Sequence, residues 1–254
     1  VKRTVVVMSN PRLQPLGDTA WIVEFGQTID EATHERVMGL AQALADAKTH
    51  GRWPGIVEWV PAYTSLTVHF AADEDGDAAL AAADALLALA RTTEPLSRPG
   101  RRWRLPVCFD AEFAPDLAEV AQARGLAPQQ VVALMTASAF RVYMLGFQPG
   151  FPYMGGLPDA LDLPRRATPR TAVPERSLAI AGRMCAVYPW RSPGGWHLLG
   201  RTPLALFDAG IADDPAWLHP GDEVHWSAID RATFDDLERA AAAGTLQRQT
   251  WLDA

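Results

Sequence analysis

The chain has 254 residues, 48% of them apolar and 21% charged, which excludes a disordered or fibrous protein and allows two folded domains. A net charge of −7 argues against a general nucleic-acid binder, and no apolar run approaches the roughly 20 residues of a membrane span. The apolar stretch at the start is too short for a signal peptide, and Cys108 and Cys185 form no CxxC pair. We therefore expect a cytoplasmic protein with reduced, buried cysteines and no membrane partner.

The first ninety residues predict a small α+β domain over residues 1–91. Alternating apolar residues indicate strands, and Asp30 stands where it can cap a helix. In chain order we expect strands at Arg12–Leu16 and Ala20–Phe25, a helix from Asp30 to about His50, strands at Ile56–Val60 and Ser65–Phe70, and a helix from about Asp75 to Ala90. The order ββαββα predicts a four-stranded sheet with two helices on one face.

The segment TTEPLSRPGRR at 92–102 is polar and contains two prolines, which predicts a linker. Beyond it, many short apolar runs separated by glycine and proline predict an all-β barrel or sandwich over residues 103–254. In chain order we expect a strand at Trp103–Cys108, helices at about Asp116–Arg124 and Pro128–Ala139, strands at Val142–Leu145, Leu178–Ala181, Ala186–Tyr188, Trp196–Leu199 and Val224–Ile229, and a last helix at about Arg231–Ala243.

Several common catalytic motifs are absent from the sequence. Neither of its two lysines belongs to a P-loop, and there is no GxSxG, HExxH or GxGxxG. The six histidines have no neighbouring Cys or His at metal-site spacing, so we infer no metal. Between Arg141 and Arg201, however, eight arginines stand against three acidic residues. This window carries +5 and the rest of the chain −12, which indicates a site for a small anion unless the arginines are solvated or paired one by one.

Two loops in this window carry candidate substrate-binding residues. GFQPGFPYMGGLP (146–158) is too rich in glycine and proline for a helix or a regular strand. We expect a loop packed by Phe147 and Phe151, with Gln148 and Tyr153 facing a substrate. PRRATPRTAVP (164–174) places Arg165, Arg166 and Arg170 among prolines, where guanidinium forks can bind a carboxylate or a phosphate. We expect Arg170 to be functional and leave Arg166 out of the site. In the alternative, Arg166 is solvated and one of the other two binds the C-terminal end of a helix.

A third loop, SPGGWHLLGRTP (192–203), carries candidate catalytic residues. Gly194-Gly195 can form a nest of backbone N–H groups for an oxyanion, and His197 is a proton shuttle or else a hydrogen-bonded strand residue. If Arg201 and Arg170 are exposed and hold one anion, alanine at either position lowers anion affinity about ten- to hundredfold and leaves the fold stable. In PGDEV (220–224), Asp222 is expected to cap a turn.

Eight motifs occur in the order and spacing of a known family. They are LGDTAWIVEFG, VPAYTSL, PVCFDAEFAPDL, GFQPGFPYMGGLP, PRRATPR, SLAIAG, VYPWRSPGGWHLLGRTPLALFD and PGDEV. On these motifs the chain resembles the family of the 5-oxoprolinase B subunit, also described as allophanate hydrolase subunit 1, sporulation-kinase-inhibitor-like or carboxyltransferase-domain subunit 1. The resemblance implies an α+β N-terminal domain followed by a cyclophilin-like β-barrel domain.

The resemblance also implies an activity. It points to one component of an ATP-dependent complex that opens 5-oxo-L-proline to L-glutamate, or acts on a related urea- or allophanate-type amide. The implied partners are a second barrel protein of the C type and a protein of the A type, and which component binds ATP is open. The resemblance implies that Arg170 and Arg201 hold the substrate carboxylate or a phosphorylated intermediate, and that Gly194-Gly195 faces developing negative charge. Together with the residues singled out above, the candidate catalytic residues are Tyr153, His197, Gly194 and Gly195, and the candidate substrate-binding residues are Gln148, Arg165, Arg170 and Arg201. Related barrels form the carboxyltransferase part of urea carboxylase. Biotin is therefore an implied cofactor only if this chain has a carboxyltransferase-type role.

The chain departs from the family pattern at three positions. Met135 stands where the family usually has His, Met184 where it has Gln, and Arg176 where it has Gly. The two methionines lack hydrogen-bonding groups that can contact a substrate. The alternative is therefore a regulatory binding protein that inhibits a sensor histidine kinase through its C-terminal barrel, while prolyl isomerase activity rests on fold analogy alone.

Overall fold

The computed structural model describes residues 10–53, 55–72, 77–96 and 100–253. The chain divides into two compact units between residues 98 and 99, and each unit is described by itself. The predicted helix start at Asp75, residues 97–99 of the predicted linker and residues 1–9 lie outside the described residues.

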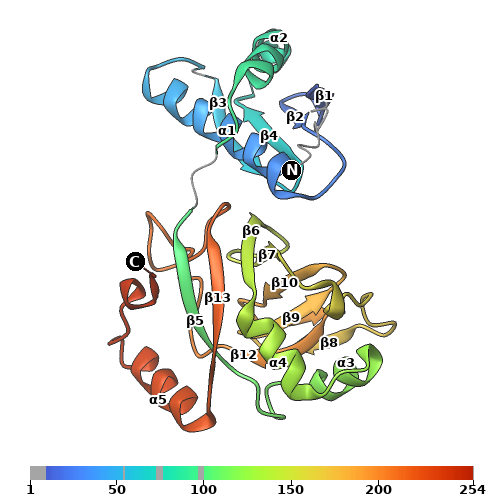
Figure 1. Ribbon diagram of the computed structural model, residues 1–254. Helices are drawn as coiled ribbons and strands as arrows, with labels where there is room; N and C mark the ends of the chain where they lie inside the picture. Colours follow the sequence, from blue (N-terminus) through green and yellow to red (C-terminus); the bar gives the residue numbers. More distant parts are fainter. Residues whose placement is uncertain (1–9, 54, 73–76, 97–99, 254) are drawn as a thin grey trace. The chain divides into compact units, whose positions relative to one another are not determined.

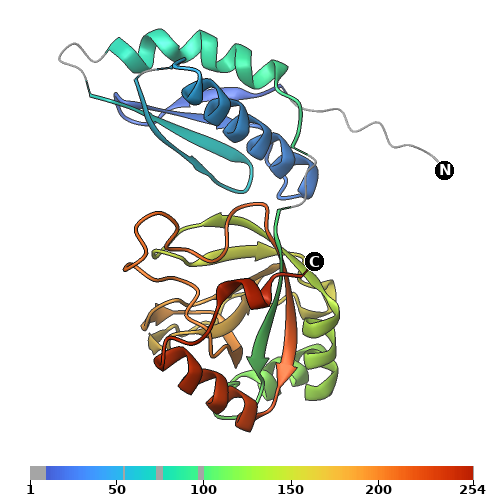
Figure 2. The same cartoon turned by 90° about the vertical axis from the view of Figure 1, so that its left-hand side faces the viewer.

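The N-terminal unit is a four-stranded antiparallel sheet with two helices (Figure 1). Its elements are β1 (Arg12–Pro15), β2 (Ala20–Glu24), α1 (Glu31–Thr49), β3 (Ile56–Pro61), β4 (Ser65–Phe70) and α2 (Asp77–Thr92). The strand order is β1-β2-β4-β3, and both helices share one hydrophobic core with a single face of the sheet (Figure 2). The Asp30 carboxylate accepts a hydrogen bond from the backbone N–H of Thr33 at 2.8 Å, which confirms the predicted cap.

Part of the predicted linker packs against α1. The N–H of Leu96 donates to the carbonyl of Glu35 at 2.9 Å. A Cβ at Gly39 would lie 2.3 Å from the carbonyl oxygen of Glu94, so this helix position must be glycine for the chain to pass so closely. Residues 93–96 therefore belong structurally to the N-terminal unit.

The C-terminal unit is built on a closed barrel of seven strands in the order β10-β7-β6-β13-β5-β12-β9 (Figure 1). Its strands are β5 (Arg102–Cys108), β6 (Ala139–Leu145), β7 (Pro152–Gly155), β8 (Arg170–Val173), β9 (Ser177–Ala181), β10 (Met184–Val187), β11 (Ser192–Gly194), β12 (His197–Arg201) and β13 (Glu223–Ile229). Its helices are α3 (Leu117–Arg124), α4 (Pro128–Ala137) and α5 (Arg231–Ala242), with short 3-10 turns at Asp159–Leu161 and Arg248–Trp251. β8 and β11 pair as a separate two-stranded sheet. The barrel prediction is confirmed.

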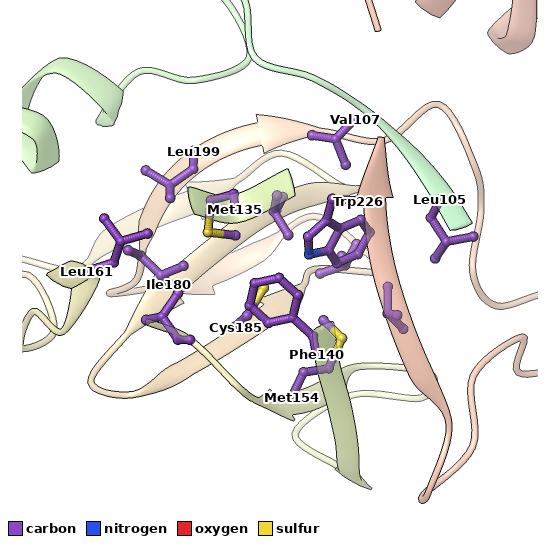
Figure 3. Close-up of a cluster of buried hydrophobic side chains, with 14 of the residues drawn as sticks. Leu105, Val107, Met135, Phe140, Met154, Leu161, Ile180, Cys185, Leu199 and Trp226 are labelled. Carbon is purple, nitrogen blue, oxygen red and sulfur yellow. The ribbon is translucent and has the colours of Figure 1, made fainter. Parts of the chain in front are cut away.

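Apolar side chains fill the barrel. Figure 3 shows Trp226, Phe140, Met135, Met154 and Cys185 packed together, and all are fully or almost fully buried. Both cysteines are buried and free, as predicted, and burial raises the pKa of the Cys185 thiol. The three cavities described below are lined by residues of loops, strands and α3.

The loop predicted over 146–158 is wrong in its second half. Residues Pro152–Gly155 form β7, which pairs with both β6 and β10. Proline is tolerated there because it occupies the first position of the strand. Phe151 is buried, as expected, but Phe147 is 60% exposed rather than packed inside the loop.

Candidate functional site

One pocket of about 120 Å³ has a mostly aromatic wall, and we call it the Arg165 pocket. Phe151 lies in the middle of that wall, with its ring centroid 4.8 Å from that of Tyr153 and 5.1 Å from that of Tyr188. Trp196 lies 6.1 Å from Phe151 on another side, and Phe147 also lines the pocket. Four residues predicted from three separate loops meet here: Tyr153, Arg165, Gly194 and Gly195.

Local backbone structure brings these residues together. Tyr153 lies on β7 and Gly194 on β11. The loop that carries Arg165 is bound to the end of β11 by the next residue. The N–H of Arg166 donates to the carbonyl of Gly195, which directly follows β11, at 2.8 Å. A Cβ at Gly194 would lie 2.3 Å from the hydroxyl oxygen of Tyr188, so only glycine lets this backbone form the pocket wall.

The guanidinium of Arg165 is available to a ligand. Over the described parts of the chain it makes no hydrogen bond or ion pair, and its Cζ lies 6.0 Å from the ring centroid of Trp196. Arg165 is exposed at the pocket rim. A planar cation that is held beside an aromatic wall suits a carboxylate, which can accept two parallel hydrogen bonds from it.

Tyr153 offers a proton donor at the same pocket. Burial raises the pKa of its phenol, against the opposing charge of Arg165. The hydroxyl group is therefore protonated at neutral pH and can donate to a carbonyl oxygen.

The predicted oxyanion nest is not formed by Gly194 and Gly195. In such a nest, one of two successive residues has a right-handed helical conformation and the other has a positive φ. Neither glycine has a positive φ. Gly194 is instead a residue of β11, opposite Arg170 of β8. The two glycines shape the pocket wall rather than concentrate backbone N–H groups.

Arg166 and Arg170 bind a buried carboxylate that the sequence analysis did not single out. The Asp116 side chain is 3% exposed and accepts from Arg170 Nη2 at 2.6 Å and from Arg166 Nη1 at 3.0 Å. It also accepts from the backbone N–H of Leu198 at 2.7 Å. Burial opposes ionisation, but the hydrogen bonds from Arg170 and Leu198 outweigh it and hold the pKa of Asp116 below its usual value. We call Asp116, Arg166 and Arg170 the Asp116 cluster. The alternative in which Arg166 is solvated is wrong, because Arg166 is paired here.

Arg170 and Arg201 line a different cavity, of about 250 Å³. Arg170 and Ala172 of β8 line this cavity, and Val173 belongs to the buried cluster of Phe151 and Trp196. The cavity and the Arg165 pocket share none of their lining residues. Arg201 Nε donates to the carbonyl of Glu175 at 3.0 Å. Burial, with the nearby charge of Arg176, lowers the pKa of Arg201. That these two arginines hold one anion stays a prediction.

Two further candidates lie outside the Arg165 pocket. His197 is 7% exposed, and its Nε2 lies 3.0 Å from the carbonyl oxygen of Pro164, which matches the hydrogen-bonded alternative. It lines a third cavity of about 150 Å³, together with Arg165 and Glu119. Gln148 is half-buried in a turn and is not among the residues that line the three cavities.

The three departures from the family pattern have distinct positions. Met135 is fully buried in the barrel core (Figure 3) and lines none of the three cavities. Met184 packs against the aromatic cluster that contains Phe151. Arg176 has a φ of +65°, the left-handed region that favours glycine, and its side chain is bound to Glu238 Oε1 at 2.6 Å.

Among the residues that the structure describes, no three His, Cys, Asp or Glu side chains lie where they could hold a metal ion. Within the same residues, no helix combines the length and the apolar character needed to cross a membrane.

Comparison with known proteins places this barrel and its loops in a family. The family described as carboxyltransferase domain, subdomain C and D, matches residues 11–218. The chain is similar to the B subunit of 5-oxoprolinase from Bacillus subtilis, with 37% identity over 88% of this chain and 95% of that protein. It is also similar to the B subunit of 5-oxoprolinase from Escherichia coli O157:H7, with 40% identity over 86% of this chain and 96% of that protein.

Solved structures agree with this placement. The protein TTHA0988 is 35% identical over 84% of this chain, with a TM-score of 0.71, and the match spans 40% of that longer protein. The urea amidolyase of K. lactis has a TM-score of 0.72 over 96% of this chain and 16% of its own length, but at 21% identity this similarity bears on the fold alone. The fold, the order of the motifs and these relatives show that the chain belongs to the 5-oxoprolinase B-subunit family of carboxyltransferase-domain proteins.

Proposed function

We propose that the chain is one component of an amidohydrolase complex that opens 5-oxo-L-proline to L-glutamate, and that the Arg165 pocket holds the substrate. In this reaction water adds across the lactam C–N bond while ATP is hydrolysed. The complex would also contain a second barrel protein of the C type and a protein of the A type. Relatives named as the B subunit of 5-oxoprolinase support the complex, and the pocket supports the position of the substrate.

The observation that carries this proposal is the free guanidinium of Arg165 beside an aromatic wall. Arg166 and Arg170 already bind Asp116, and Arg201 binds a backbone carbonyl. Arg165 is thus the one of these four loop arginines with no hydrogen bond or ion pair among the described residues. A carboxylate bound there needs to displace no partner.

The other groups of the pocket suit the rest of a lactam. A five-membered ring can lie against the rings of Phe151 and Trp196. The protonated hydroxyl of Tyr153 can donate to the lactam carbonyl oxygen, on which negative charge develops when water adds. His197 is left out of this assignment because its Nε2 is already bound to the Pro164 carbonyl.

The size of the pocket supports a small substrate. At about 120 Å³ it is well below the roughly 300 Å³ at which pockets for drug-sized ligands begin. This volume suits a five-membered lactam rather than a nucleotide.

The test is reconstitution with the two partner proteins. We expect L-glutamate to form from 5-oxo-L-proline only when all three proteins and ATP are present, and omission of this chain should abolish the reaction. Allophanate, assayed in parallel, distinguishes the related urea-type activity. A complete complex that turns over neither compound would contradict the proposal, and isolation of this chain with a sensor histidine kinase instead would favour the regulatory alternative.

A further inference from the structure

Phe147 combines three features that a surface residue of the barrel does not need. It has a φ of +66°, it is 60% exposed, and it lines the Arg165 pocket. A positive φ is a genuine outlier for a bulky side chain because its Cβ crowds the backbone. Exposure of a large apolar ring to water adds a second unfavourable contribution. Neither feature stabilises the folded chain.

The surrounding loop holds Phe147 in this conformation. The N–H of Gln148 donates to the carbonyl of Gly146 at 2.7 Å, which closes a γ-turn with Phe147 at its centre. A γ-turn with a positive φ at its central residue is rare and strained. The N–H of Phe151 then donates to the carbonyl of Gln148 at 3.0 Å, and Gly150 in this second turn has a φ of +76°.

A third hydrogen bond closes the loop at its base, where the N–H of Gly146 donates to the carbonyl of Phe151 at 3.1 Å. The loop is also tied to the rest of the barrel unit at Gly150. A Cβ there would lie 2.5 Å from the Cβ of Phe207, so the two chain segments are in close contact. Strain that is maintained by so many local contacts at the mouth of a pocket points to a functional constraint on the residue that bears it.

The ring of Phe147 has space to receive a ligand. It meets the ring of Phe151 edge-on, at a centroid distance of 5.4 Å and an interplanar angle of 79°. Phe151 is buried in the pocket wall, so Phe147 stands at its exposed rim. A flat ring that enters the pocket toward Arg165 would cover the exposed apolar surface of Phe147.

We propose that Phe147 is the specificity-determining residue of the Arg165 pocket, where it covers the ring of a cyclic amide and favours it over the open-chain product. The inference rests on the proposed function. An open-chain glutamate has no ring to pack against Phe147, so it gains no corresponding contact there. Phe147 therefore strengthens binding of the lactam more than binding of the product.

The test uses the reconstituted complex with two substitutions that separate the ring from the backbone strain. Phe147→Ala removes the ring and keeps a side chain at positive φ, whereas Phe147→Gly removes the ring and relieves the strain. We expect both variants to raise KM for 5-oxo-L-proline about tenfold, since each loses one apolar contact with the substrate. The ratio of the inhibition constant of L-glutamate to this KM should fall in both, and Phe147→Gly should melt at a higher temperature than Phe147→Ala.

Trp190→Ala is the matched control, because Trp190 is also an exposed aromatic residue but does not line the pocket. Its KM should equal that of the wild type. If melting temperatures change while KM and the inhibition ratio do not, or if Trp190→Ala raises KM equally, Phe147 has no role in specificity. An inactive wild-type complex would overturn the proposed function together with this inference, whereas an active complex with unchanged kinetics in both Phe147 variants would overturn this inference alone.

Discussion

Replacement of Arg170 tests the energetics of the Asp116 cluster. The Asp116 side chain is 3% exposed and Arg170 is 25% exposed, so Arg170→Ala leaves a buried carboxylate with one of its cationic partners missing. Removal of one partner of a buried ion pair typically costs about 3–5 kcal/mol. Arg166 and the N–H of Leu198 still bind Asp116 in the variant, and we therefore expect a loss of about 2–3 kcal/mol in the free energy of unfolding. The expectation that alanine at Arg170 leaves the fold stable holds only if the side chain is exposed, and its ion pair with buried Asp116 does not meet that condition.

The pH dependence of this loss has a definite sign. The pKa of Asp116 is lower in the folded chain than the roughly 3.9 expected when unfolded. Its ionised form therefore stabilises the fold fully above about pH 4, and this contribution is lost as the pH falls through the lowered folded pKa. Arg170→Ala raises the folded pKa, so the difference in stability between wild type and variant should be constant from about pH 6 to 8 and should shrink below about pH 4.

The assay is urea denaturation of the full chain, followed by tryptophan fluorescence at several pH values. Hydrogen exchange at the Leu198 amide, which donates to Asp116, adds a local measurement and should accelerate in the variant. Arg183→Ala is the matched control, because Arg183 pairs with Asp159 on the surface, where both side chains are mostly exposed. If Arg170→Ala unfolds within about 0.5 kcal/mol of Arg183→Ala at pH 7, the reasoning is refuted.

Three further substitutions test particular positions. Arg176→Ala should be less stable in urea than Arg176→Gly by about 1 kcal/mol, because both lose the ion pair with Glu238 but only alanine keeps a side chain at φ +65°; equal stability would contradict the strain argument. Gly194→Ala should lower stability by about 1–3 kcal/mol and raise KM for 5-oxo-L-proline, since its Cβ would meet the Tyr188 hydroxyl; unchanged values of both would show that the wall adapts. Met135→His, which restores the usual family residue, should lower the melting temperature and cost about 1–3 kcal/mol because a polar ring enters an apolar core; a variant as stable as the wild type would mean that the core holds a partner for it.

Most of the fold follows from local patterns in the sequence. Asp30 precedes an amphipathic run, and it caps α1 as predicted. The predicted strands of both units recur with shifts of a few residues at their ends, because strand ends depend on pairing partners rather than on local propensity. The wrong prediction of a loop at Pro152–Gly155 has the same origin. Proline and glycine signal a loop, but two neighbouring strands pair with this segment and override the local preference.

The candidate site is less accessible to sequence reasoning because it depends on pairing over long distances. In PRRATPR the sequence does not distinguish Arg165 from Arg170. They differ in that Arg170 pairs with Asp116, which lies 54 residues earlier in the chain. In the sequence Asp116 has the signal of a helix cap, yet its carboxylate bonds β12 and two arginines instead of its own helix. The γ-turn at Phe147 likewise has no signature of its own, since its residue type favours a different backbone conformation.

The most direct test of the account is the steady-state kinetics of Arg165 variants in the reconstituted complex. If Arg165 binds the substrate carboxylate, Arg165→Ala should lose a charge-assisted bond and raise KM for 5-oxo-L-proline about ten- to hundredfold. Arg165→Lys should recover only part of this loss, because an ammonium group lacks the planar fork. Arg183→Ala, an exposed arginine away from the pocket, should behave as wild type. An unchanged KM in Arg165→Ala, with the loss found in Arg201→Ala instead, would contradict the account and move the substrate to the cavity lined by Arg170 and Arg201.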